Sequence, residues 1–281
     1  MASQRYTDLK KLFEDAMPES GLLKDRYTRL GKAMVDELSI PTHWGNYAAC
    51  DELVGGTKRT ALGIPPVIIL LESKEIDSAN RLDMGKRQLK RLHQGEEQTM
   101  VRPVRVVGVS VPMTTGDRGR APKPVSTLDL LNKPLDRGHV MALEIGGPDD
   151  AENIVPQWSQ WQQSGLWRYH ETQVREFGEI ILSAESGLPA MKKVASSVST
   201  PLVVVNLSLE YTGSISNTRW TTPSAVDWET YVFRPVTGSG KFEAIQIHTL
   251  SLRLDAEFGD ALAQKAYKEY CAEIDTGMKT E

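Results

Sequence analysis

The chain has 281 residues, of which 40% are hydrophobic and 25% are charged, so it is long enough to bury a sizeable core and has an ordinary globular composition. The longest apolar run, 64–71, is far too short to cross a bilayer as a helix, and the N-terminus lacks the apolar segment of a secretory signal peptide. Only Cys50 and Cys271 are present, which excludes a disulfide framework. We therefore expect cytoplasmic synthesis; export without a cleaved signal peptide stays open.

The net charge of −4 is unfavourable for a general nucleic-acid binder, but it is unevenly distributed. Between Lys86 and Val140 there are 11 basic and 5 acidic residues, so this segment carries +6 and the rest of the chain −10. A basic segment of this kind suits a polyphosphate substrate. The alternative is that these charges lie on separate, solvated faces of the protein.

Hydrophobic periodicity predicts several helices and strands in chain order. Helices are expected at 5–37, 76–92, 162–182 and 255–274. Strands are expected at 67–71, 104–112, 140–145, 153–155, 201–211, 230–235 and 242–252, with a hairpin turn at 237–240. Residues 40–63 and 113–134 are expected to be irregular, because they are rich in glycine and proline or other turn-forming residues.

This order of elements does not follow a regular βαβ alternation, so we predict an α+β fold with a central antiparallel sheet and flanking helices. Residues 1–100 are expected to form a mainly helical N-terminal region, either a separate cap or packed on the rest. Residues 101–281 are expected to form the second domain.

Three short motifs stand out between residues 134 and 182. The first is Asp136-Arg-Gly-His139, the second is Asn153-Ile-Val-Pro-Gln157, and the third is Trp167 followed by Glu171 four residues later. A Gly-Gly-Pro turn at 146–148 separates the first two. In this order and spacing, the chain resembles the DNA/RNA non-specific endonuclease family, the ββα-metal or His-Me finger nucleases, and is most like the version found in bacterial toxin domains.

The resemblance implies a ββα-metal active site within about 134–182 and Mg²⁺-dependent hydrolysis of phosphodiester bonds in DNA, RNA or both, with Mn²⁺ as a second possible ion. A potent nuclease threatens the cell that makes it. We therefore expect a toxin or effector with an inhibitor or immunity protein as partner, and no membrane span.

The first two motifs supply three candidate catalytic residues. His139 is the candidate general base, since an unperturbed imidazole has a pKa of about 6.5. By resemblance, Arg137 contacts phosphate, for which a planar guanidinium is suited. By the same resemblance, Asn153 supports the site through amide hydrogen bonds. The alternatives are a structural histidine at a strand start for His139 and a turn residue for Asn153.

The third motif lies on the predicted helix. The resemblance implies that Glu171 holds metal-bound water. Arg175 follows one turn later, where it could pair with Glu171 or contact substrate. The alternative is a surface ion pair of little consequence. Upstream, Arg118 and Arg120 are candidate phosphate contacts, although a solvated turn is the simpler interpretation.

The expected metal ligand departs from the family. The family has an asparagine four residues before the tryptophan, and here that position is Gln163. Because the preceding segment is one residue longer than expected, Gln162 is the alternative in a shifted register. A glutamine amide oxygen can bind a hard cation, but through a longer side chain. The sequence therefore leaves two interpretations: an active nuclease, or a catalytically degenerate nuclease-like scaffold that binds nucleic acid or a protein without cleaving.

Overall fold

The computed structural model describes residues 29–34, 36–38, 47–50, 52, 59, 64–75, 99–113, 135–158, 165–183, 201–211 and 223–253. The helices predicted at 76–92 and 255–274, and nearly all of the irregular segment predicted at 113–134, lie outside these residues. None of the described helices is long and apolar enough to cross a membrane.

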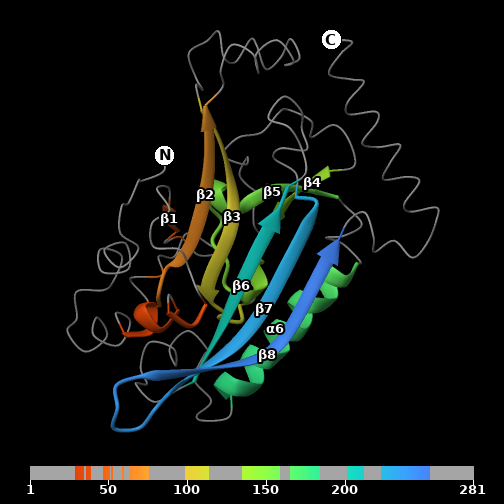
Figure 1. Ribbon diagram of the computed structural model, residues 1–281. Helices are drawn as coiled ribbons and strands as arrows, with labels where there is room; N and C mark the ends of the chain where they lie inside the picture. Colours follow the sequence, from red (N-terminus) through yellow and green to blue (C-terminus); the bar gives the residue numbers. More distant parts are fainter. Residues whose placement is uncertain are drawn as a thin grey trace, which may run out of the picture.

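A six-stranded antiparallel sheet forms the centre of the described structure (Figure 1). Its strands are β1 (Tyr47–Cys50), β2 (Val67–Glu75), β3 (Thr99–Val109), β6 (Leu202–Glu210), β7 (Ala225–Pro235) and β8 (Phe242–Arg253), in the order β1-β2-β3-β6-β7-β8. The predicted α+β class with a central antiparallel sheet is therefore confirmed. Because β1 and β2 belong to this sheet, the region before residue 101 contributes strands as well as helix.

The central strands form where β-branched residues are concentrated. In β6, all six residues from Leu202 to Leu207 are buried, which explains why five of the six are apolar and why this part of the strand does not alternate. The predicted turn between β7 and β8 is also confirmed. It contains Gly238 at φ 75°, a left-handed conformation that glycine adopts without strain.

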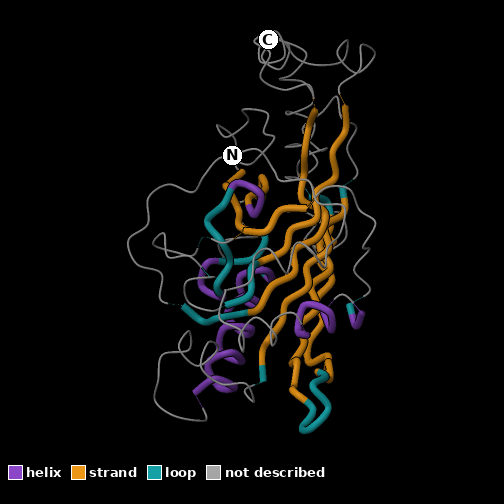
Figure 2. Tube along the Cα trace, turned by 90° about the vertical axis from the view of Figure 1, so that its left-hand side faces the viewer, coloured by secondary structure: helices purple, strands orange, loops and turns teal. Residues whose placement is uncertain are grey.

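Apolar side chains cover both faces of the sheet and form two cores. One core lies against helix α6 (Leu166–Ser183) and includes Val106, Val205, Trp167 and Trp228. The other lies on the opposite face, against the helical residues 29–34 and 36–37, and includes Leu30 and Met34. Figure 2 shows the strands from the side, with helical segments beside them.

The segment of the three motifs forms a separate unit on the α6 side. It consists of β4 (Leu135–His139), the short 3₁₀ helices η3 (Leu143–Ile145) and η4 (Ala151–Asn153), β5 (Ile154–Trp158) and α6. Among the strands that the structure describes, β4 and β5 pair only with each other, as an antiparallel two-stranded sheet. Helix α6 packs on η3 and against β6 and β8 of the large sheet.

Two boundaries in this unit were predicted wrongly. The strand expected at 140–145 is a buried loop with η3, and the strand instead precedes and ends at His139. The prediction was wrong because an apolar run indicates burial, and these apolar side chains are buried in a loop rather than in a strand. Gly146, at φ 86°, ends η3 in the left-handed conformation. Helix α6 begins at Leu166, not at residue 162.

A fully buried arginine anchors this loop to the large sheet. Arg59 donates hydrogen bonds to the carbonyl oxygens of Pro65 (2.8 Å), Val109 (3.0 Å) and Gly146. A buried guanidinium is costly unless its N–H groups find acceptors, and here three carbonyl groups supply them. The end of η3 is thereby held against β3, which fixes the position of the loop that follows His139.

Candidate functional site

Strands β4 and β5 present the first two motifs side by side. In their register, Asp136 pairs with Gln157, Gly138 with Val155 and His139 with Ile154. Gly138 is required here, because a Cβ atom at this position would lie 2.0 Å from Oε1 of the buried Gln157 side chain. Arg137 is half-buried on the same strand, opposite Pro156.

Asn153 closes the loop between the two strands. Its Nδ2 donates to the carbonyl oxygens of Met141 (2.9 Å) and Pro148 (2.8 Å), and its Oδ1 accepts from the Met141 backbone N–H (3.0 Å). The Asn153 carbonyl oxygen also accepts from the Val140 N–H (2.8 Å). The side chain is fully buried. Asn153 therefore fixes the backbone that leaves His139.

His139 is 4% exposed, and its Nε2 lies 2.8 Å from Oδ1 of Asp149, in the loop before η4. A carboxylate in this position orients the imidazole ring. Proton transfer from a water molecule would then use the other ring nitrogen or require Asp149 to move. The sequence analysis missed Asp149, because a contact across a ten-residue loop has no local spacing signal.

The loop beyond Asp149 is strongly acidic. Burial, together with the negative charges of Glu152 and Glu52, raises the pKa of Asp150 to about 6. This local potential is negative and so favours a cation near His139. However, no group of three or more His, Cys, Asp or Glu side chains in the described ranges is arranged to hold a metal ion.

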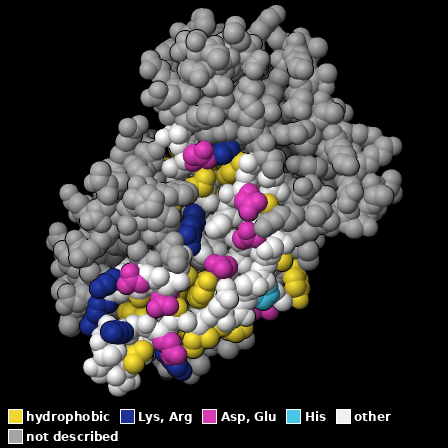
Figure 3. All heavy atoms as spheres, viewed as in Figure 1, with side chains coloured by type: hydrophobic (Ala, Val, Ile, Leu, Met, Phe, Trp, Pro, Cys, Tyr) yellow, Lys and Arg dark blue, Asp and Glu magenta, His cyan; other side chains and the backbone are white. Residues whose placement is uncertain are grey.

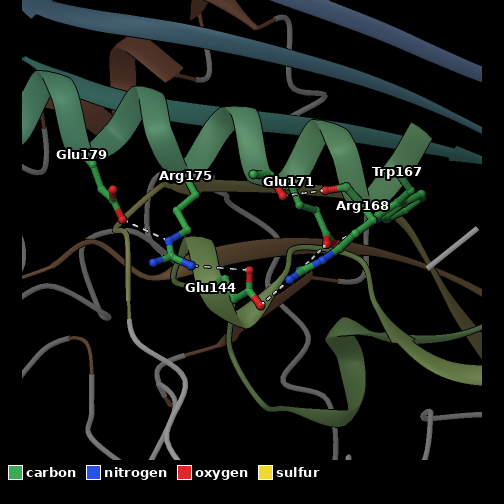
Figure 4. Close-up of polar contacts among 7 residues, drawn as sticks. Glu144, Trp167, Arg168, Glu171, Arg175 and Glu179 are labelled. Carbon is green, nitrogen blue, oxygen red and sulfur yellow. Dashed lines mark hydrogen bonds and ion pairs between the residues drawn. The ribbon is translucent and has the colours of Figure 1, made fainter. Parts of the chain in front are cut away.

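Glu171 lies near the start of α6 and is 5% exposed. The Trp167 indole Nε1–H donates to its Oε1 (2.7 Å), and Nη1 of Arg168 lies 3.3 Å from its Oε2 (Figure 4). Burial raises the pKa of Glu171 to about 7, although both of these hydrogen bonds act to lower it. A carboxyl group with this pKa can give or take a proton near neutral pH, which suits it to acid–base work.

The arginines of α6 are paired differently from the prediction. Arg175 does not take Glu171 as its partner. Its Nε donates to Oε1 of Glu179 (3.0 Å), and its Nη1 lies 3.9 Å from Oε2 of Glu144 in η3. Arg168 instead bridges Glu171 and Glu144, with 2.8 Å between its Nη2 and Glu144 Oε1. The difference arises because η3 packs on α6 and brings a carboxylate that helical spacing alone does not reveal.

Glu144 thus lies between two arginines that are about two turns apart on α6, as Figure 4 shows. The sequence analysis assigned no role to Glu144 or Arg168. The i,i+3 spacing of Arg168 and Glu171 was a usable signal, whereas the 24-residue separation of Glu144 and Arg168 was not.

The remaining candidates lie outside the described residues. These are the candidate metal ligands Gln162 and Gln163 and the candidate phosphate contacts Arg118 and Arg120. On the face drawn in Figure 3, the basic and acidic side chains of the described part are interspersed rather than separated by sign.

No protein-family model matches this chain, and no curated protein matches it. One similar solved structure is described as "Structure of Sda1 nuclease with bound zinc ion". The similarity covers 78% of this chain and 81% of that chain, with 12% sequence identity and a TM-score of 0.28. A TM-score of this size is too low to establish a shared fold.

Proposed function

We propose that this protein is a metal-dependent nuclease that hydrolyses phosphodiester bonds in DNA, RNA or both. The observation that carries the proposal is the contact between the buried His139, at the end of β4, and the partly exposed Asp149. It belongs to a unit in which a β-hairpin is followed by a helix carrying Glu171, in the order that the sequence motifs indicate. A base, charge stabilisation around the phosphate and a cation for the leaving oxygen are the requirements of this chemistry.

In this proposal His139 is the general base, and Asp149 orients it. Asn153 acts as a positioning residue, since its three side-chain hydrogen bonds hold the backbone next to the histidine. Glu171, with its pKa near 7, is a second group able to exchange a proton. Arg137 and Arg175 are the proposed phosphate contacts, together with Arg118 and Arg120.

The proposed cofactor is Mg²⁺, with Mn²⁺ as a substitute, and its proposed ligand is Gln163 or, in the shifted register, Gln162. When bound, such an ion would neutralise the charge that develops on the leaving oxygen. The acidic loop around Asp150 gives this part of the protein a negative potential that favours a cation nearby.

We further propose a toxin or effector role, with an inhibitor or immunity protein as partner. A sequence-tolerant nuclease would otherwise attack the nucleic acid of the cell in which it is made. If expression of the chain alone stops cell growth, co-expression of a candidate inhibitor protein should restore growth. Cells that express the His139→Ala variant should grow without the inhibitor.

The alternative is a nuclease-like scaffold that binds without cleaving. The observation that favours it is that Arg168 and Arg175 of α6 both form ion pairs with carboxylates. Neutralised in this way, the two guanidinium groups attract a polyanion less strongly than isolated ones.

The test uses purified full-length protein with plasmid DNA and with structured RNA, in Mg²⁺ or in EDTA. Cleavage is expected in Mg²⁺ only, and His139→Ala is expected to lower its rate by about 10²–10⁴-fold, the usual contribution of a general base. Asp149→Asn should lower the rate less, because the base remains. Parent-like activity in a folded His139→Ala protein would remove His139 from the mechanism, and binding without cleavage by the parent would support the scaffold.

A further inference from the structure

A second histidine of α6 lies in the core and has no role in the proposed nuclease site. His170 is 1% exposed and faces the large sheet, where its ring centroid is 4.4 Å from that of Trp228. Neither Nδ1 nor Nε2 of His170 has a hydrogen-bond partner. Buried polar atoms are nearly always hydrogen-bonded, so an imidazole with two unpartnered nitrogens indicates a missing water molecule or ligand.

Other unpartnered polar atoms lie on the strand beneath it. The Trp228 indole N–H and the Thr230 hydroxyl are both buried without a hydrogen-bond partner, and they are two residues apart on β7. Side chains two residues apart in a strand point to the same face. Here that is the face that packs against α6, because Trp228 belongs to the same core as Trp167.

A second imidazole reaches the same place from β8. His248 is the cross-strand partner of Thr230, and its ring centroid lies 4.3 Å from that of His170, with 46° between the ring planes. Unlike His170, His248 is exposed to solvent. The pair therefore joins a buried ring and an accessible ring, and β8 provides a route for a small ion from solvent.

The arrangement of the pair favours a metal ion as ligand, because the two imidazole rings adjoin and neither nitrogen of the buried ring has a hydrogen-bond partner in the described structure. A neutral imidazole keeps a lone pair and is a preferred ligand of Zn²⁺, Cu²⁺ and Ni²⁺. No third His, Cys, Asp or Glu completes a ligand group with them in the part of the chain that the structure describes, which disfavours Mg²⁺ and Ca²⁺, since those ions require several oxygen ligands.

We propose that His170 and His248 form a two-imidazole binding site for a divalent ion of the Zn²⁺ type, between α6 and the β7–β8 hairpin. The two ring centroids lie 4.3 Å apart, and a bound ion would need one nitrogen of each ring at about 2.0–2.1 Å. Water would supply the remaining ligands, and the buried Thr230 hydroxyl, which has no other hydrogen-bond partner in the described structure, could accept a hydrogen bond from it. The site is independent of the proposed nuclease chemistry, because it uses neither His139 nor Glu171.

The experiment measures Zn²⁺ binding by calorimetry on metal-stripped, full-length protein. His248→Gln is the main variant, since an exposed strand residue can be replaced without disturbing the core. It is expected to weaken Zn²⁺ binding by about tenfold or more, because one of two protein ligands is lost. His170→Phe should abolish the same binding event, and a His170→Phe protein that fails to fold leaves the His248→Gln comparison intact.

The matched control is His139→Ala, which should leave Zn²⁺ affinity at this site unchanged and affect only cleavage. Loading with Cu²⁺ gives a second readout, since the nitrogen hyperfine pattern should report two imidazoles in the parent and one in His248→Gln. A parent that binds no Zn²⁺, or a His248→Gln protein that binds it as tightly as the parent, would overturn the site. Loss of Zn²⁺ binding in His139→Ala alone would also overturn it, by assigning the ion to the loop around His139.

Discussion

The two sides of helix α6 satisfy their polar groups in opposite ways. On the side that faces η3, Arg168, Glu171 and Arg175 are all engaged in hydrogen bonds or ion pairs, and Glu144 connects the two arginines. On the side that faces the sheet, apolar packing dominates, and the nitrogens of His170 have no partner. The same turns of the helix thus carry a paired charge network on one side and buried polar atoms without a hydrogen-bond partner in the described structure on the other.

Burial shifts the pKa of a base and the pKa of an acid in opposite directions, and α6 shows both cases side by side. His170 and Glu171 are neighbours and both are buried. Burial lowers the pKa of His170 to about 4 and raises that of Glu171 to about 7. In both cases the neutral form is favoured, because a low-dielectric environment penalises charge whatever its sign.

The largest expected effect concerns the sheet side of α6. Trp167 is fully buried and contacts the ring of Trp228 edge-on, at 5.8 Å between centroids. Trp167→Ala should lower the free energy of unfolding by about 3–5 kcal/mol, because it leaves a large cavity. Urea denaturation measures this. The matched control is Tyr169→Ala on the same helix, where a side chain that is 62% exposed should cost only about 0.5 kcal/mol. Equal losses for the two variants would contradict the packing of α6 on the sheet.

The next effect is the pH dependence of the free energy of unfolding. His170 and Glu171 contribute to this dependence with opposite signs. Because the folded pKa of Glu171 is raised from 4.5 to about 7, its contribution to stability is lost as the pH rises through this window. The loss is at most roughly 3 kcal/mol, since one pKa unit corresponds to about 1.36 kcal/mol. Because the folded pKa of His170 is lowered from 6.5 to about 4, its contribution is lost as the pH falls from 6.5 to about 4.

Single variants separate the two contributions. Glu171→Gln should leave a stability that rises with pH between about 4 and 6.5, and His170→Phe should leave one that falls between about 4.5 and 7. Thermal unfolding at half-unit pH steps measures both profiles. Parallel profiles for the parent and both variants would show that neither group is shifted as described.

The smallest expected effect concerns the paired side of α6. Glu144→Gln removes the carboxylate between Arg168 and Arg175, which makes this face more positive. In a His139→Ala background, binding of a short DNA duplex should tighten by a factor of about 2–5, since exposed ion pairs are worth about 0.2–1 kcal/mol. Glu179→Gln is the control, because Glu179 pairs with Arg175 alone in the described network. Unchanged affinity in Glu144→Gln would show that these arginines face away from substrate.

Much of the sheet could be predicted from residue pattern. The strands predicted at 67–71, 104–112 and 201–211 overlap with β2, β3 and β6, because clusters of valine, isoleucine and leucine favour extended backbone in a buried sheet. The prediction was too short for β2, and it was displaced toward the C-terminus for β3. The β7–β8 turn was predictable from Gly238 and Gly240, which occupy left-handed conformations. The predictions of the strands and of the turn both rest on local backbone preferences.

The loop after His139 shows where such reasoning fails. The run from Val140 to Ile145 has the composition of a strand, yet it is held as an irregular buried loop by the amide of Asn153 and the guanidinium of Arg59. Both contacts join residues that are distant in sequence. Apolar composition predicted burial correctly and predicted the backbone conformation wrongly, since loops can also be buried when side chains satisfy their carbonyl and N–H groups.

The sequence by itself determined most of the described strands and local pairs such as Trp167 with Glu171, because one helical turn brings residues four apart into contact. Only the tertiary structure decided which charges meet across elements: Asp149 with His139, and Glu144 with Arg168. It also brought His170 of the helix beside His248 of the strand, although the two residues are 78 positions apart in the chain. The physical reason is that helical and strand periodicity fix which face a side chain occupies, whereas its partner depends on how the faces of separate elements pack together.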